Sequence, residues 1–202
     1  MNIEGLGAIR GTEDEIAAAI GDTSRLPQDI FQATAQVLRK QTRLNVVVLG
    51  PSPSGGDIYN KRCGLRDELI RQGHRAYFLE DRLTPEVLTA SGLNLSVAEY
   101  LMASEADYIV CFMTSPGAIA EVHEFADRRK LACKMMVCID SQHQDGYSAH
   151  GILRIFEGLH GRIDWFQYPE DIRECHLSTR VMDQIQKVVE SKQSELVIGE
   201  GI

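Results

Sequence analysis

The feature that most constrains the fold is a regular alternation of short apolar runs with amphipathic segments, which begins at Asn45. The apolar runs that predict strands are 45–50, 75–81, 106–113, 134–140 and 162–168. The segments that predict helices are 59–72, 95–104, 118–131, 148–160 and 175–191. Strands that are apolar on both faces and alternate with helices are typical of a parallel sheet covered on both sides. With right-handed crossovers, the pattern predicts an α/β fold, a Rossmann-like doubly wound three-layer sandwich with a mainly parallel five-stranded sheet.

The first 43 residues lack any strand pattern and predict an N-terminal helical extension. Thr12 and Glu15 have the spacing of a capping box, and residues 27–41 carry an apolar stripe at helical spacing. An amphipathic helix outside the main core predicts contact with a second copy or with a partner protein. The expected division is an extension at 1–43, a Rossmann-like domain at 44–191 and a C-terminal tail at 192–202.

Composition excludes several classes of function. The chain of 202 residues has a formal net charge of −8, which opposes a broad electrostatic grip on nucleic acid or on an anionic membrane. No apolar run approaches the roughly 18 residues of a membrane span, and no secretory signal is visible, so we expect a cytoplasmic protein without membrane contact. Five cysteines without a CxxC pair, and histidines without ligand spacing, predict buried free thiols and no metal site.

Ligands of an open α/β sheet bind beyond the carboxyl ends of its strands, so the loop after the first strand is a candidate site. Its sequence, GPSPSGGD, is rich in glycine, which permits close approach of the backbone, and the helix that follows presents free N–H groups. The loop lacks GxGxxG and the GK[ST] of a P-loop, so a plain connection remains the alternative. The candidate ligand contacts are Gly50, Pro51, Ser52, Asp57, Tyr59, Lys61 and Arg62.

Two further strand ends carry polar residues. Glu80 and Asp81 end the second strand, either as solvated acids or a helix cap, or with one of them holding a sugar hydroxyl. After the third strand, Gly117 is expected to allow a sharp turn, and Ser115 to cap the next helix or bind a ligand.

Glu121 is the unusual acid of that helix. The expected buried stripe is Ile119, Val122, Phe125 and Ala126. Glu121 falls at the flank of the stripe, whereas Glu124 falls nearly opposite and is expected to be solvated. Because helical side chains tilt towards the N-terminus, Glu121 should lean towards the strand ends. A favourable interaction with the helix dipole is the alternative reason for an acid at this position.

These segments together resemble the nucleoside 2-deoxyribosyltransferase-like superfamily, whose wider relatives include the lysine-decarboxylase-like phosphoribohydrolases. The resemblance rests on Gly50-Pro51 after the first strand, on Lys61 and Arg62, and on ADYIVCF followed by SPGAIAEVHEFA. It covers roughly residues 45–170. The fuller PGGxGTxxE form of the phosphoribohydrolases is absent, because Ala118-Ile119-Ala120 stands in its place.

The resemblance implies cleavage of an N-glycosidic bond, with Glu121 as the nucleophile or as the stabiliser of an oxocarbenium ion. It implies a nucleoside, a nucleotide or NAD as the substrate and no separate cofactor. A purine or pyrimidine leaving group would need a second acid, for which Asp81 and Asp57 are the candidates. The glycine-rich loop, Ser115 and Gly117 would hold the sugar and any 5′-phosphate.

Two other readings of the same fold remain open. One is a non-catalytic nucleotide-sensing module that acts through partner subunits. The other is a flavodoxin-like or dehydrogenase cofactor domain, which the lack of a dinucleotide fingerprint after the first strand disfavours.

Overall fold

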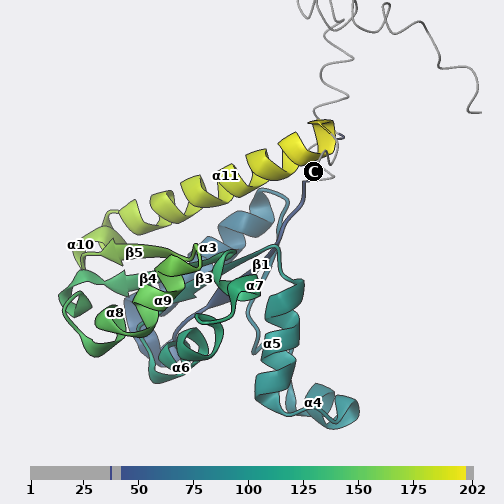
Figure 1. The fold of residues 1–202 in the computed structure, drawn as a ribbon, viewed down its shortest axis with the longest axis horizontal. Coiled ribbons are helices and arrows are strands. Elements are labelled where there is room, and N and C mark those ends of the chain that lie inside the picture. The colour runs from purple at the N-terminus through teal and green to yellow at the C-terminus, as the bar shows by residue number, and fades with distance from the viewer. Residues whose placement is uncertain (1–36, 38–41, 199–202) are drawn as a thin grey trace, which may run out of the picture. The chain divides into compact units, whose positions relative to one another are not determined.

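The computed structural model describes residue 37 and residues 42–198, and its centre is a single parallel sheet (Figure 1). The strands are β1 (Asn45–Leu49), β2 (Arg75–Tyr77), β3 (Tyr108–Phe112), β4 (Met135–Asp140) and β5 (Arg162–Phe166). Their order is β2-β1-β3-β4-β5, and each neighbouring pair is parallel. The α/β prediction with a five-stranded sheet is therefore confirmed.

Helices cover both faces of the sheet, because successive strand residues point to opposite sides. Val46 and Val48 pack with residues of α3 (Gly56–Arg71), α10 (Glu170–Arg173) and α11 (His176–Ile198). Val47 and Leu49 pack in a second core on the other face. The helices on that face are α5 (Leu95–Glu105), α6 (Pro116–Phe125), α7 (Arg129–Ala132) and α9 (Ile152–Gly158). The result is the predicted three-layer arrangement (Figure 1).

Several helix boundaries differ from the sequence pattern. The segment 118–131 forms two helices, α6 and α7, and 148–160 forms α8 (Tyr147–His150) and α9, with Gly151 between them. An unpredicted helix, α4 (Pro85–Ser91), begins where Thr84 accepts a hydrogen bond from the Val87 backbone N–H. Short 3₁₀ turns occupy Pro53–Gly55 and Ser141–His143.

The predicted boundaries at the two ends of the chain compare with the structure as follows. The final helix continues to Ile198, whereas the sequence pattern ends it at residue 191 and starts the tail at 192. The chain divides into two units between Thr42 and Arg43. The helices predicted within 1–43 lie outside the described residues.

The cysteines only partly follow the expectation of buried thiols. All five are free, and Cys111 and Cys138 are buried in β3 and β4. Cys133 and Cys175 are exposed, so the expectation is wrong for these two, which lie in connections that follow α7 and α10. Among the described residues, no helix has both the length and the apolar character needed to cross a membrane.

Candidate functional site

The strand order places the candidate site between β1 and β3. From β1 the chain continues to β2 on one side, and it then returns to form β3 on the other side. The carboxyl ends of β1 and β3 are thus the switch point at which ligands of open α/β sheets bind. The helices that leave these ends are α3 and α6, which contribute Arg62 and Glu121.

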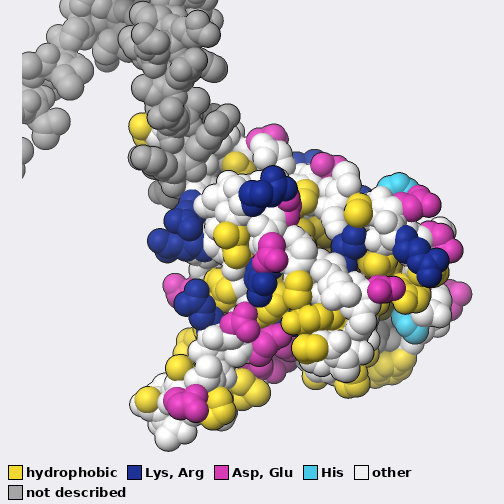
Figure 2. All heavy atoms as spheres, turned by 180° about the vertical axis from the view of Figure 1, so that it is seen from behind, with side chains coloured by type: hydrophobic (Ala, Val, Ile, Leu, Met, Phe, Trp, Pro, Cys, Tyr) yellow, Lys and Arg dark blue, Asp and Glu magenta, His cyan; other side chains and the backbone are white. Residues whose placement is uncertain are grey.

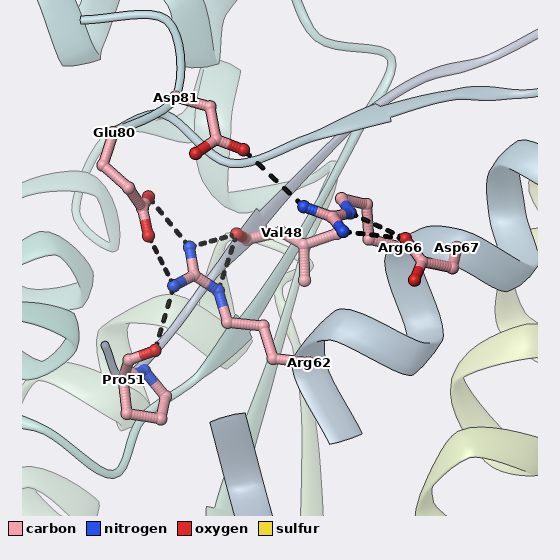
Figure 3. Close-up of polar contacts among 7 residues, drawn as sticks. All are labelled: Val48, Pro51, Arg62, Arg66, Asp67, Glu80 and Asp81. Atoms are coloured by element: carbon pink, nitrogen blue, oxygen red, sulfur yellow. Dashed lines mark hydrogen bonds and ion pairs between the residues drawn. The ribbon is translucent and has the colours of Figure 1, made fainter. Parts of the chain in front are cut away.

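Arg62 is the organising residue beneath the first loop, and its side chain is only 1% exposed. Its Nε and Nη2 donate to the Val48 carbonyl oxygen at 3.1 and 2.8 Å, and its Nη1 donates to the Pro51 carbonyl oxygen at 3.0 Å. Nη1 and Nη2 also bind the Glu80 carboxylate at 2.6 and 2.9 Å (Figure 3). The guanidinium further lies 3.9 Å from the ring centroid of Phe78. These five bonds use every N–H donor of the side chain, so none is left for a ligand in this structure.

Gly50 makes room for this arrangement. Its φ is +152°, and a Cβ at this position would lie 3.1 Å from Arg62 Cδ and from Phe112 Cβ. Pro51 is buried and contributes its carbonyl oxygen to Arg62, whereas Ser52 is exposed and its hydroxyl bonds Ser54 at 3.0 Å. The start of the glycine-rich loop therefore encloses the arginine.

The adjacent acids Glu80 and Asp81 lie in the turn after β2, which ends at Tyr77 and not at residue 81 as predicted, and different arginines of α3 hold them. Glu80 is paired with Arg62, but just over half of its side chain remains exposed. Asp81 lies 3.6 Å from Nη1 of Arg66, which also binds Asp67 (Figure 3). The structure thus directs Glu80 towards the switch point and Asp81 towards the surface of α3.

Glu121 is a largely buried carboxyl with unusual electrostatics. Burial, followed by the neighbouring charges of Glu99 and Glu80, raises the pKa of Glu121 to about 7, which Arg62 only partly offsets. Its Oε2 is buried and has no hydrogen-bond partner. A desolvated carboxyl among other carboxyls holds a proton near neutral pH and can accept or deliver one there.

The N-terminus of α6 is only partly as predicted. Ser115 caps the helix by accepting a hydrogen bond from the Ala118 N–H at 3.3 Å. Gly117 lies inside the helix without a positive φ, and a Cβ there would meet nothing, so the expected sharp turn is wrong. The Thr114 hydroxyl at the end of β3 is buried without a partner and, like Glu121 Oε2, is an unsatisfied oxygen.

The inner face of α6 also needs two corrections. Val122, Phe125 and Ala126 are buried as expected, but Ile119 is 40% exposed, and Ala118 is buried instead. Glu124 is partly buried and accepts a hydrogen bond from Ser96, so it is not the freely solvated acid that helical phase predicts. The reason is Ser96 of α5, whose hydroxyl reaches the Glu124 carboxylate.

The other predicted site residues of the first loop and of α3 do not lie at the switch point. Asp57 and Lys61 line a cavity of about 740 Å³ between α3 and α11, together with Ser178 and Thr179. Lys61 Nζ donates to Cys175 Sγ at 3.3 Å. The pKa of Tyr59 is raised, first by its hydrogen bond to Cys63. The cavity lining includes neither Glu121 nor Glu80, so the structure does not bring Asp57 and Lys61 together with them.

Glu99 of α5 is the site residue that sequence reasoning missed. Burial and the charges of Glu124 and Glu80 raise its pKa, and it is the charge with the largest effect on Glu121. It is the sole charged residue between Leu95 and Ser104, and it shares a helix face with Ala98 and Ala103, which are buried. The same argument from helical phase that identifies Glu121 as an unusual acid therefore also applies to Glu99.

A family model supplies the relationship that the geometry alone does not. The model of the STM3845 retron effector protein matches residues 62–198, which are 137 of the 202 residues. The chain belongs to this family. The part shared with the STM3845 retron effector proteins begins at Arg62 and includes Glu80, Glu99 and Glu121.

Other comparisons found a distant likeness to a solved structure. The Clostridium botulinum CMP N-glycosidase BcmB is 14% identical to this chain, with a TM-score of 0.35. The match covers 65% of this chain and 98% of BcmB. The search of curated proteins found no match.

The raised pKa of Glu121 predicts a measurable effect on stability. Well below pH 4.5 the carboxyl is protonated in both the folded and the unfolded chain, so it does not make the free energy of unfolding depend on pH. Between about pH 4.5 and 7 the unfolded chain loses this proton first, so the free energy of unfolding should fall as pH rises. We expect Glu121→Gln to remove about 2 kcal/mol of that fall. Urea unfolding of both proteins at pH 5 and pH 8 measures the effect, and equal pH dependence would contradict it.

Proposed function

We propose that this chain cleaves the N-glycosidic bond of a nucleoside, a nucleotide or NAD. The observation that carries the proposal is the Glu121 carboxyl, which has a buried oxygen without a partner and lies at the switch point near Glu99 and Glu80. Departure of the base leaves positive charge on the sugar, and an ionised Glu121 either captures C1′ covalently or stabilises that charge. The strand order supports this role, because α6 follows β3 at the switch point where α/β folds bind small ligands.

Glu99 is the acid that we assign to the leaving group. Two interacting carboxyls share protons, so one can be ionised while the other stays protonated. As the bond between C1′ and the base nitrogen breaks, Glu99 gives its proton to that nitrogen. Water then adds its hydroxyl to C1′ and returns a proton to Glu99. Asp81 and Asp57, the sequence candidates for this role, face Arg66 and the α3–α11 cavity.

The direct experiment is incubation of the full chain with a panel of nucleosides, nucleotides and NAD, with free base measured by chromatography. Release from one class identifies the substrate, and we expect no added cofactor to be required. Contact through residues 1–43 with a second copy or a partner, and a cytoplasmic location, remain part of the proposal. An inactive chain on every substrate, with and without candidate partners, would contradict catalysis.

The pH profile tests the roles of the two carboxyls. Because Glu121 must be ionised and its pKa is raised to about 7, release of a leaving group that needs no acid should increase from pH 5.5 to pH 8. A purine or pyrimidine substrate also needs protonated Glu99, so its rate should pass through a maximum and fall as Glu99 ionises. Nicotinamide departs neutral from NAD, so the NAD profile should level off instead. A rate that is constant across this range would exclude Glu121 as the ionised catalyst.

The second candidate function is nucleotide sensing without turnover. The observation that favours it is the cavity of about 740 Å³ lined by Asp57, Lys61, Ser178 and Thr179, which does not include Glu121. Nucleotide binding there would raise the melting temperature, and the increase should grow with the logarithm of the ratio of ligand concentration to Kd. The increase should survive Glu121→Gln and be lost in Lys61→Met.

A further inference from the structure

The helices α4 and α5 form an arm that projects from the body of the domain (Figure 1). An unusual share of its side chains is apolar and open to solvent, as the yellow spheres at the lower left of Figure 2 show. The arm surface, as we define it, consists of Val87, Leu93, Leu95, Val97 and Leu101.

The arm surface is distinct from the face by which α5 packs on the domain. Ala98 and Ala103 are buried, and Tyr100 and Met102 contact the core. Val97 and Leu101, four residues apart and therefore neighbours on a helix, are 43% and 48% exposed. Apolar residues thus occupy two sides of α5, and on one of these sides Val97 and Leu101 remain open to solvent. Clustered exposed apolar side chains typically mark an interaction site.

The charge around this surface is mostly negative, although Arg128 from the body of the domain lies 4.5 Å from the ring centroid of Tyr100. No lysine or arginine occurs between residues 83 and 127, although the chain has 21 of them. The acids on the outer side of the arm are Glu86 and Glu105, whereas Glu99 lies on the opposite side of α5, near Glu121. Magenta side chains accompany the yellow ones on the arm in Figure 2. The apolar residues are therefore bordered by negative charge.

We propose that the arm surface docks a protein whose own apolar surface is bordered by lysine and arginine. Complementary charge at the rim of an apolar contact favours the correct partner and excludes others. A second copy joined arm to arm would bring acids against acids. A nucleic acid would present phosphates to the same acids and offers little to the exposed Val97 and Leu101. This inference does not depend on the activity of Glu121.

A helical peptide probe tests the proposal with the full chain. One synthetic peptide carries a leucine face flanked by lysines, and the control replaces every lysine with glutamate. Fluorescence anisotropy should show binding of the lysine peptide and not of the glutamate peptide. The double variant Val97→Ser/Leu101→Ser should weaken that binding at least about tenfold, a change of about 1.4 kcal/mol. Ile70→Ser/Ile155→Ser, which alters residues that are 50% and 52% exposed on α3 and α9, should leave it unchanged.

The charge contribution is tested separately. Glu86→Gln/Glu105→Gln should weaken binding of the lysine peptide at low salt, and the difference from wild type should shrink at high salt. Equal binding of both peptides, no binding of the lysine peptide, or equal loss in the two serine variants would overturn the proposal. So would a dimer in light scattering that Val97→Ser/Leu101→Ser converts to a monomer, because the occupant would then be a second copy.

Discussion

Glu121→Gln is expected to lower base release by roughly 10³-fold while leaving the fold intact. Glutamine keeps the shape of the side chain, but it can neither bear the negative charge that stabilises the sugar cation nor act as a nucleophile. The carboxyl has no hydrogen bond at Oε2 to lose, so the substitution breaks no contact there. Chromatographic measurement of free base under single-turnover conditions gives the rate of the bond-breaking step.

Glu124→Gln is the matched control, because Glu124 lies on the same helix and also raises the pKa of Glu121. Its hydrogen bond runs to Ser96, so we expect its rate to remain within about threefold of wild type. Glu99→Gln distinguishes between the leaving groups by their need for an acid, since it should slow release of purines and pyrimidines more than release of nicotinamide. If Glu121→Gln retained the wild-type rate, Glu121 would have no catalytic role.

The fold followed from the sequence because each of its signals is local. Apolar runs such as 45–50 and 106–113 are buried on both faces, and this pattern does not depend on which strands are neighbours. The capped start of α6 at Ser115 was also predictable from the residues beside it. The unpredicted α4 is a shorter element, yet Thr84 and Pro85 carry the ordinary signals of a helix start.

The site was harder to predict because its electrostatics depend on distant residues. Arg62 stood out as a basic residue near a loop, but Glu80 lies eighteen residues further on, and the pairing arises only when β2 lies beside β1. Likewise, Glu99 and Glu124 come together because α5 packs beside α6, as the hydrogen bond from Ser96 to Glu124 shows. Periodicity identified Glu121 as unusual but did not identify the carboxyls around it.

Arg62→Met should lower the free energy of unfolding by about 3 kcal/mol, because several charge-assisted hydrogen bonds are lost at once. Methionine can fill part of the space beside Phe78, but it leaves the Val48 and Pro51 carbonyl oxygens without these donors. Glu80 would also lose the partner that fixes its carboxylate near Glu121. Urea unfolding measures the stability, and base release should fall together with it if the loop and Glu80 position the substrate.

Arg66→Met is the control for this substitution, because Arg66 lies one turn further along α3 and also stacks on Phe78. Its partners, Asp67 and Asp81, are both more than half exposed, so its loss should cost less than about 1 kcal/mol. A large cost for Arg62 beside a small cost for Arg66 would show that burial of the guanidinium, and not positive charge on α3, holds the first loop in place. Equal costs would mean that the two arginines serve the same function, and that Arg62 has no special part in shaping the switch point.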